Sequence, residues 1–401
     1  MRFSAAPLLP LLIAACGAPA VESPAALESR ELPTPAAAGS FAPRLTAVGE
    51  EAGLTWIEKT GAEGRHRIRF ARLDGVRWSA PSTIVAGDDL FANWADLPAA
   101  VAGGDGALYA HWLAKTGEET YAYSIFLARS DDEGSHWRPL GRLNDDDTST
   151  EHGFVSWLPE EAGVRAVWLD GREMASGGPM TLRTALVDAS GAGAGQLLDE
   201  RVCECCNTAA ARSGDGTVLV AYRDRAAGEV RDIATVRGGA GGWSEPMVPH
   251  ADGWGIPGCP VNGPGVAAAG SDAALVWFTA AGGAPTVRAA LSSDGGETFA
   301  PAWTVDAEGP LGRVDAAWWG DAAWVVWMAP DGDEAEVRLA RVSEEGPAEP
   351  LVVARTSAAR ASGFPRLLAQ ERRLLVAWTE VADGSPRQVR LAEVPLAASS
   401  Q

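Results

Sequence analysis

Short apolar runs that end in an aromatic residue and lead into a polar turn recur along the chain. They end at Trp56, Trp112, Trp168, Tyr222, Trp277, Trp327 and Trp378, so successive aromatics lie 56, 56, 54, 55, 50 and 51 residues apart. Short runs bounded by turns, without a helical period, are typical of β-strands. A strand-type repeat near fifty residues indicates a β-propeller with one four-stranded blade per repeat. The pattern predicts an all-β propeller of seven blades.

The fifth repeat shows the expected order of strands within a blade. An extended run at 264–269 precedes the strand that ends at Trp277, and residues 286–291 and 302–305 supply the two outer strands. The seventh repeat has no outer strand after Val394. We therefore expect residues near 32–38 to supply that strand and close the ring.

Composition fits a single large domain. The chain has 401 residues, including 16 Trp and 46 Gly, and a formal net charge of −20 at pH 7. A propeller of about 350 residues commonly forms one domain, so we assign 42–401 to one propeller. The acidic surface disfavours nucleic acid and anionic lipid headgroups as partners. We expect a monomer without a nucleic-acid partner.

The N-terminal residues resemble the export signal of a bacterial lipoprotein. Arg2 precedes an apolar stretch at 5–15, and Ile13-Ala14-Ala15-Cys16 matches the lipoprotein processing box. The segment is too short to span a bilayer as a helix. It predicts a signal peptide over 1–15, lipidation of Cys16 and a flexible tether over 16–41. Position 17 is Gly and not the Asp of the usual inner-membrane retention signal, so we expect an outer-membrane anchor in the cell envelope, with lipid as the only membrane contact.

Four further cysteines lie in the connections that precede the innermost strands of two adjacent blades. Cys203, Cys205 and Cys206 precede the fourth aromatic, and Cys259 precedes the fifth. An even number of cysteines in an exported protein favours disulfides. We predict that Cys259 bonds to one of the other three and that the remaining two pair locally. A thiolate site for a metal such as copper and a redox pair are the alternatives; no other cofactor is expected.

The repeat also places the unusual polar segments on one face of the disc, in the connections before the innermost strands and the loops after the aromatics. Propeller sites form where these loops converge over the channel. Arginines from several blades aimed at one channel suit a carboxylate, sulfate or phosphate. The predicted ligand-binding residues are Arg172, Arg223, Arg313, Arg366, His152 and Asn262. The alternative is that acidic neighbours pair with these arginines and leave the mouth neutral.

Two octapeptides, Ser130–Trp137 and Ser292–Phe299, fit the Asp-box pattern S-x-D-x-G-x-x-W/F. Over 42–395 the chain resembles the sialidase-like propellers that contain this turn. Within them it looks closest to exported bacterial lipoproteins with C-x-C-C, Y-R-D-R and G-C-P-V-N-G-P segments, all present here. The resemblance implies a propeller, with six blades in sialidases as the alternative to seven.

The same resemblance raises the question of catalysis. The resemblance to sialidases implies a Tyr nucleophile late in the chain that a Glu activates, an Asp acid/base and an F-R-I-P-like segment. Here no Tyr follows Tyr222 and no such segment is found. The candidate catalytic residues are Asp170, Tyr222, Asp224 and Glu151. We expect sialidase activity to be absent or very weak.

Two hypotheses follow from the sequence. The first is a sialidase-like hydrolase that cleaves an acidic glycan or related ester at the arginine-lined channel. The second is a non-catalytic lipoprotein of the cell envelope that binds an anionic small molecule, an acidic glycan, a metal or an envelope partner. They differ in whether Tyr222 or a pair of carboxylates faces the channel beside the arginines.

Overall fold

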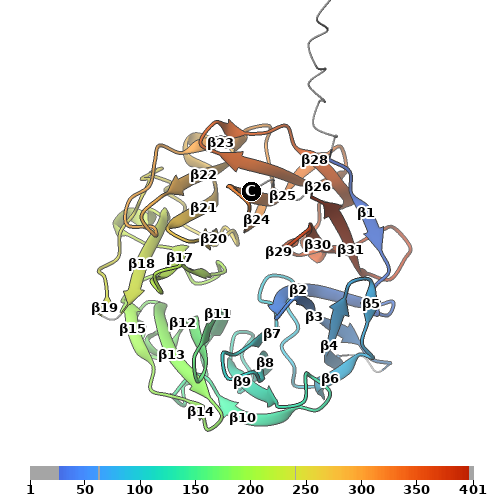
Figure 1. Ribbon diagram of the computed structural model, residues 1–401. Coiled ribbons are helices and arrows are strands. Elements are labelled where there is room, and N and C mark those ends of the chain that lie inside the picture. The colour runs from blue at the N-terminus through green and yellow to red at the C-terminus, as the bar shows by residue number, and fades with distance from the viewer. Residues whose placement is uncertain (1–26, 62–63, 240, 397–401) are drawn as a thin grey trace, which may run out of the picture.

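The computed structural model describes residues 27–61, 64–239 and 241–396. Within them the chain forms seven antiparallel sheets arranged in a ring (Figure 1). The fold is a seven-bladed β-propeller, as the spacing of the aromatics predicted, and the six-bladed alternative is wrong. Among the described residues no helix is long and apolar enough to cross a membrane.

The sheets follow one another along the chain, and each begins with its innermost strand. The first three blades comprise β2 (Ser40–Val48), β3 (Glu51–Lys59), β4 (His66–Asp74), β5 (Arg77–Trp78) and β6 (Ser82–Gly87); β7 (Ala99–Ala102), β8 (Leu108–Lys115), β9 (Tyr123–Ser130) and β10 (Arg138–Arg142); and β11 (His152–Glu160), β12 (Gly163–Asp170), β13 (Thr181–Asp188), β14 (Gly191–Ala192) and β15 (Gln196–Asp199). The fourth and fifth comprise β16 (Ala209–Arg212), β17 (Val218–Arg223), β18 (Ile233–Gly239) and β19 (Gly242–Trp243); and β20 (Gly265–Ala269), β21 (Asp272–Thr279), β22 (Thr286–Ser292) and β23 (Trp303–Asp306). The last two comprise β24 (Gly312–Trp319), β25 (Ala322–Asp331), β26 (Glu334–Ser343), β27 (Gly346–Pro347) and β28 (Leu351–Ser357); and β29 (Arg366–Gln370), β30 (Arg373–Glu380), β31 (Gln388–Pro395) and β1 (Arg30–Leu32). Four short 3-10 turns, η1 (Arg172–Ser176), η2 (Ala227–Glu229), η3 (Ala281–Gly283) and η4 (Arg360–Ser362), lie in the loops.

The N-terminal strand β1 completes the seventh blade. It pairs with β31, with Arg30 opposite Glu393 and Leu32 opposite Leu391. The expected closure is confirmed, although the strand overlaps the expected range 32–38 only at Leu32. Because β1 and the start of β2 belong to the ring, the boundary predicted at 42 is too late and the predicted tether does not extend over them. The predicted signal peptide and Cys16 lie outside the described residues.

The hydrophobic core is divided into layers between adjacent blades. The repeat aromatics lie in the second strands, and Trp56, Trp168, Trp277 and Trp327 are almost completely inaccessible. One layer packs Trp56 of blade one against Leu391 of blade seven. Burial of a large apolar side chain contributes roughly 1.5–3 kcal/mol. Each blade therefore buries its apolar side chains against those of the neighbouring blades.

The two faces of the disc carry different loops. What we call the connection face carries the connections between blades and the loops from second to third strands. The opposite face, the turn face, carries the remaining turns, including both Asp-box segments. In the first of these, Asp132 accepts the backbone N–H of His136 at 2.8 Å, and Gly134 has φ +86°. These are the local bonds and backbone geometry expected for such turns.

Hydrogen bonds between a backbone N–H of one blade and a side chain of its neighbour recur near the connection face. The pairs are Ala42 with Thr379, Ala100 with Thr55, Phe154 with Asp96, Gly263 with Asn207, Arg313 with Asn262, and Leu367 with Asp315. Blades three and four are joined by Thr208, whose hydroxyl donates to the carbonyl of Phe154 at 2.8 Å. These contacts, the inter-blade hydrogen-bond ring, link all seven blades.

Three donors in this ring have an unusual backbone. Ala42, Phe154 and Arg313 each have φ +56°, a region that residues other than Gly rarely adopt. Each lies where the pairing of an innermost strand slips by a β-bulge. Such strain costs about 1–3 kcal/mol and persists only where surrounding contacts hold it.

Asn262→Ala should destabilise the protein by about 1–3 kcal/mol, because the buried N–H of Arg313 loses its acceptor. Asn93→Ala is the matched control, since its side chain accepts only from Ala95 in the same loop. The control should change stability by less than about 0.5 kcal/mol. Urea unfolding of the two variants tests this, and equal losses would contradict it.

Candidate functional site

The connection face of blade three gathers several predicted site residues in one polar cluster. The buried Asp170 carboxylate accepts the indole N–H of Trp168 at 2.8 Å and the Nε–H of Arg172 at 2.7 Å. His152 Nε2 lies 3.2 Å from Asp146 and 3.7 Å from Asp170. Burial lowers the pKa of His152, but the hydrogen bond to Asp146 and the charge of Asp170 raise it overall. These three residues have the donor set of a metal site, yet the cation that contacts Asp170 is the Arg172 guanidinium.

The arrangement around Asp170 repeats in other blades, which identifies its role. The indoles of Trp56, Trp277 and Trp327 donate to Glu58, Asp252 and Asp306, and these carboxylates pair with Arg67, Arg288 and Arg338. In blade three Trp168 donates to Asp170, and the arginine that faces Trp168 across the strands, as Arg288 faces Trp277 and Arg338 faces Trp327, is Arg183, 3.9 Å from Asp170. The recurrence therefore explains Asp170 as the acceptor of the tryptophan of its blade, whereas Arg172 is an additional partner of Asp170 from the loop after β12.

Tyr222 takes the place of the tryptophan in blade four. Its hydroxyl donates to Asp199 at 2.5 Å, and its side chain is fully buried among residues of blades three and four. Burial, followed by the charge of Asp199, raises its pKa. The phenol is held neutral between blades, so Tyr222 is not placed as a nucleophile facing the channel.

Two other predicted arginines are held by backbone carbonyls. Arg223 donates to the carbonyls of Asn262, Arg231 and Phe278. Arg313 donates to the carbonyl of Gly363 and lies over the Trp94 ring, 5.3 Å from its centroid. Burial lowers the pKa of Arg313 to about 10. Both side chains tie loops of adjacent blades together.

Arg366 is also enclosed, with 3% of the residue exposed. It faces Asp315 at 3.8 Å, and burial, followed by the charge of Arg44, lowers its pKa to about 9. No hydrogen bond or ion pair described joins Arg172, Arg313 and Arg366 to a common partner. The predicted convergence of three arginines on one ligand is therefore not formed: Arg172 and Arg313 are hydrogen-bonded within their own pairs of blades, and Arg366 is buried with its Nε lacking a partner among the described residues.

Glu151 lies in a buried group of acids between blades two and three. Its carboxylate accepts the hydroxyl of Tyr123 at 2.6 Å. Burial, with a contribution from the charge of Glu204, raises the pKa of Glu151 to about 7. Asp96 is fully buried nearby with a raised pKa; Oδ2 accepts the N–H of Phe154, whereas Oδ1 has no partner among the described residues.

Asp224 lies apart from these acids, in the loop after β17. Its carboxylate accepts the backbone N–H of Arg225 at 2.6 Å. Burial, then the charge of Asp199, raises its pKa. Asp224 makes no described hydrogen bond with Glu151 or Asp170, so the predicted carboxylates do not form a catalytic pair.

The cysteines link blades four and five. A disulfide joins Cys205 and Cys259, which confirms that Cys259 bonds to one of the other three. Cys203 and Cys206 are buried free thiols, so the second disulfide predicted is not formed. Their sulfurs lie 3.2 Å apart, and Arg231 Nη1 lies 3.2 Å from Cys203.

A groove that the sequence did not predict lies on the connection face where blades one, two and seven meet. It has a volume of about 460 Å³. Its lining is Phe41, His66, Phe91, Ala92, Asn93, Trp94, Thr120, Tyr121, Ala361 and Arg387. We call it the aromatic groove. The Tyr121 side chain is exposed, with 60% of the residue accessible, so at least one aromatic ring of the groove is open to a ligand.

Cationic groups flank this groove. The Arg387 guanidinium lies 3.9 Å from the centroid of Phe41, and Arg360 lies 5.9 Å from that of Trp94. Neither side chain has a carboxylate partner among the ion pairs of the described residues. His66 Nδ1 is likewise without a partner there. The groove combines aromatic faces with unpaired cationic groups, in contrast to the paired arginines of the predicted site.

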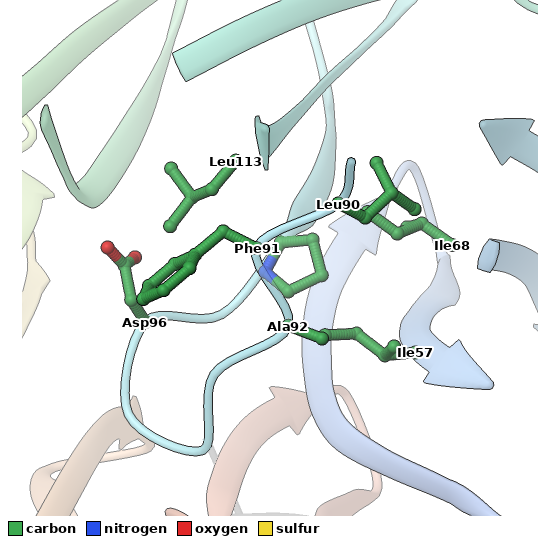
Figure 2. Close-up of a pocket in the computed structure, with 8 residues that line it drawn as sticks. Ile57, Ile68, Leu90, Phe91, Ala92, Asp96 and Leu113 are labelled. Carbon is green, nitrogen blue, oxygen red and sulfur yellow. The ribbon is translucent and has the colours of Figure 1, made fainter. Parts of the chain in front are cut away.

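Phe91 connects the aromatic groove to the buried acids. Its ring stacks on Tyr123, with centroids 4.1 Å apart. Phe91 and Asp96 also line a small cavity of about 10 Å³, which shares Phe91 and Ala92 with the groove. Figure 2 shows their side chains together with those of Leu113 and Ile57. This cavity has room for about one water molecule, so a larger ligand would be confined to the groove.

Larger depressions lie on the turn face. One of about 1080 Å³ is lined by the turns at 47–51, 318–320 and 368–373, and another of about 830 Å³ lies between blades five and six. Trp318 lines both. Both depressions on the turn face are therefore larger than the aromatic groove.

Comparisons with known proteins establish the fold alone. No family model and no curated protein matches the sequence. Among solved structures, an ulvan lyase of polysaccharide lyase family PL25 is similar with a TM-score of 0.61 and 10% identity, covering 90% of this chain and 95% of that one. A protein of unknown function from Dyadobacter fermentans has a TM-score of 0.53 and 14% identity, covering 92% and 98%. The Hadza microbial sialidase Hz136 has a TM-score of 0.45 and 15% identity, covering 73% and 63%.

Glu151→Gln should make stability less dependent on pH. The folded protein holds the Glu151 proton up to a pKa of about 7, against an ordinary value of 4.5. Between these values the unfolded state binds fewer protons, so stability falls as pH rises. From pH 5 to pH 8 the wild type should lose on the order of 2 kcal/mol more than the variant. Urea unfolding at both pH values measures this; parallel losses would show that Glu151 titrates normally.

Proposed function

We propose that this protein is a carbohydrate-binding propeller that holds an anionic glycan in the aromatic groove. The observation that carries the proposal is the exposed ring of Tyr121 beside arginines that lack a carboxylate partner among the described residues, in a chain of net charge −20. Aromatic side chains supply large apolar area with polar tips, and ligand sites combine such surfaces with a few placed polar groups. Arginine suits carboxylate and sulfate groups.

The charge distribution supports an anion as ligand. Of the arginines that the sequence favoured, Arg172, Arg223 and Arg313 are hydrogen-bonded to carboxylates or carbonyls, and Arg366 is buried 3.8 Å from Asp315. Arg387 in the groove lining and Arg360 beside Trp94 retain donors for a ligand. The surface of a strongly acidic protein repels polyanions, so a local positive site is the place where an anionic ligand would bind.

The similar lyase offers a parallel for the ligand class. A second structure of it, with a TM-score of 0.60, is bound to -[GlcA(1-4)Rha3S]-. A propeller of this architecture can therefore hold an acidic saccharide. We carry over the ligand class only, and place it by the chemistry of the aromatic groove.

We propose that the groove binds the glycan without hydrolysing it. Tyr222 is buried against Asp199, and Tyr123, although paired with Glu151, is completely inaccessible with a raised pKa. A neutral, buried phenol is a poor nucleophile. Asp170 is the acceptor of the tryptophan of its blade, so no acid and nucleophile flank the aromatic groove in the manner that glycoside cleavage needs.

Tyr121→Ala and Arg387→Ala should each weaken binding of dextran sulfate by about tenfold or more, as loss of a central contact commonly does. Uncharged dextran is the ligand control. Trp303→Ala and Arg77→Ala, which remove an exposed ring and an exposed charge elsewhere, are the variant controls. Calorimetry and affinity electrophoresis measure the dissociation constants.

The alternative location is tested in the same experiment. Arg172→Ala should leave dextran sulfate binding unchanged, because that guanidinium is paired. Loss of binding in Arg172→Ala alone would place the site in blade three, and equal loss in Arg77→Ala would indicate unspecific attraction. A fluorogenic sialoside should not be cleaved by any of these proteins, and efficient cleavage would contradict the non-catalytic assignment.

We further propose from the sequence that the protein is exported and lipid-anchored through Cys16, as a monomer in the outer membrane. Cys16→Ser should move the protein from the membrane fraction to the soluble fraction of its host, because the acyl chains supply the only membrane contact. Immunoblots of the two fractions measure this. Retention of the variant in the membrane would refute lipid anchoring.

A further inference from the structure

Four sulfur atoms meet on the connection face between blades four and five. The Sγ atoms of Cys203, Cys205 and Cys259 all lie within 4.8 Å of one another. Cys206 Sγ lies 3.2 Å from that of Cys203. The cluster therefore contains one disulfide and two thiols in mutual reach. The disulfide is the accessible part, since Cys259 is exposed and Cys205 half-buried, whereas Cys203 and Cys206 are buried.

We propose that this cluster is a thiol–disulfide exchange centre, in which the disulfide moves between the surface pair Cys205–Cys259 and the buried pair Cys203–Cys206. The attacking sulfur is that of Cys203. This activity is independent of glycan binding in the aromatic groove.

The surroundings of Cys203 favour its thiolate, the form that attacks disulfides. The hydrogen bond with Cys206 is the largest influence that lowers its pKa; burial opposes it, and Arg231 lowers it further. Burial is the main cause that raises the pKa of Cys206. The two thiols thus have the unequal roles that exchange needs: Cys203 is the nucleophile, and Cys206 is the protonated thiol that reacts second.

Arg231 is held in place for this role. Its guanidinium contacts Glu204 at 2.7 Å and Glu229 at 2.8 Å, as well as Cys203. It belongs to the connection after β17, and its exposed fraction is 3%. A buried cation fixed beside a cysteine stabilises negative charge on sulfur.

The exchange balances without an external oxidant. In the first step the Cys203 thiolate attacks Cys205 Sγ, forms the Cys203–Cys205 bond and releases the Cys259 thiolate, which takes a proton from solvent. In the second step Cys206 attacks Cys203 Sγ, forms the Cys203–Cys206 bond and transfers its proton to the released Cys205 sulfur. One disulfide and two thiols are present before and after.

The consequence is a change at the surface. The Cys205–Cys259 bond spans 54 residues and ties the connection of blade four to that of blade five. After exchange this tie is open, and the thiols of Cys205 and Cys259 are displayed on the connection face. The buried pair keeps the oxidising equivalent within the protein.

Peptide mapping distinguishes the two disulfide states of the full-length protein. Trypsin places Cys203, Cys205 and Cys206 together in fragment 202–212 and Cys259 in fragment 238–288. The Cys205–Cys259 bond links these fragments. Exchange leaves them unlinked, with an internal disulfide in 202–212. Incubation of the native protein with N-ethylmaleimide at pH 8, without reductant, traps Cys259 whenever it is released.

We expect alkylated Cys259 to accumulate together with the internally bonded fragment 202–212. Cys203→Ser should slow this labelling at least tenfold, whereas Cys206→Ser should retain it, because only the second step is lost. Arg231→Gln, with circular dichroism and melting temperature as controls of folding, provides a second test and should slow labelling severalfold.

Three results would overturn the proposal. The first is that Cys259 stays unlabelled in the wild type while the linked fragments persist. The second is that folded Cys203→Ser is labelled as fast as the wild type, which would indicate general opening of the loop. The third is four free thiols with a stoichiometric bound metal in the purified protein, which would make the cluster a thiolate metal site.

Discussion

The inter-blade hydrogen-bond ring is the constraint on which the connection face depends. Layers of apolar side chains hold the blades together, but apolar contacts are not directional. The bonds from Asp96, Asn207, Asn262, Asp315 and Thr379 to backbone N–H groups of the next blade fix how adjacent blades are aligned. Buried backbone groups must be satisfied, so each of these polar side chains is needed as the acceptor for a backbone N–H of the next blade. The strained residues Ala42, Phe154 and Arg313 are held by these same bonds.

This constraint explains why polar residues gather on the connection face without forming one site. A carboxylate, an amide or a guanidinium at these positions is needed to finish a blade or join two. The repeated contacts of a tryptophan and an arginine with one carboxylate serve the same purpose, within a blade for Glu58 and across adjacent blades for Asp306. The ligand site that we propose lies instead in the aromatic groove, where Arg387 has no carboxylate partner among the described residues, and the proposed exchange centre lies in the sulfur cluster between blades four and five.

The fold could be predicted from the sequence because the repeat aromatics are in register, one in each second strand. The missing last strand of the seventh repeat likewise predicted that an N-terminal strand closes the ring. A disulfide from Cys259 to one of Cys203, Cys205 and Cys206 followed from their positions in adjacent connections, but the sequence left the partner open. Which side chains would be free could not be predicted, since Arg172 and Arg387 look alike in sequence and differ only in their neighbours. The aromatic groove was missed because Phe41, Trp94 and Tyr121 come from separated segments, and aromatics in loops carry no specific spacing.

The short strand β1 has a mechanical consequence. It contributes only three paired residues, at the outer edge of the seventh blade, yet it is the part of the described ring closest to the N-terminus. Any pull transmitted along the chain from before residue 27 would reach the propeller through these few backbone bonds, the ion pairs of Arg30 with Glu393 and of Glu31 with Arg390, and the contacts of Leu32. The pairing of β1 with β31 is therefore the contact that tension on the N-terminal side would break first.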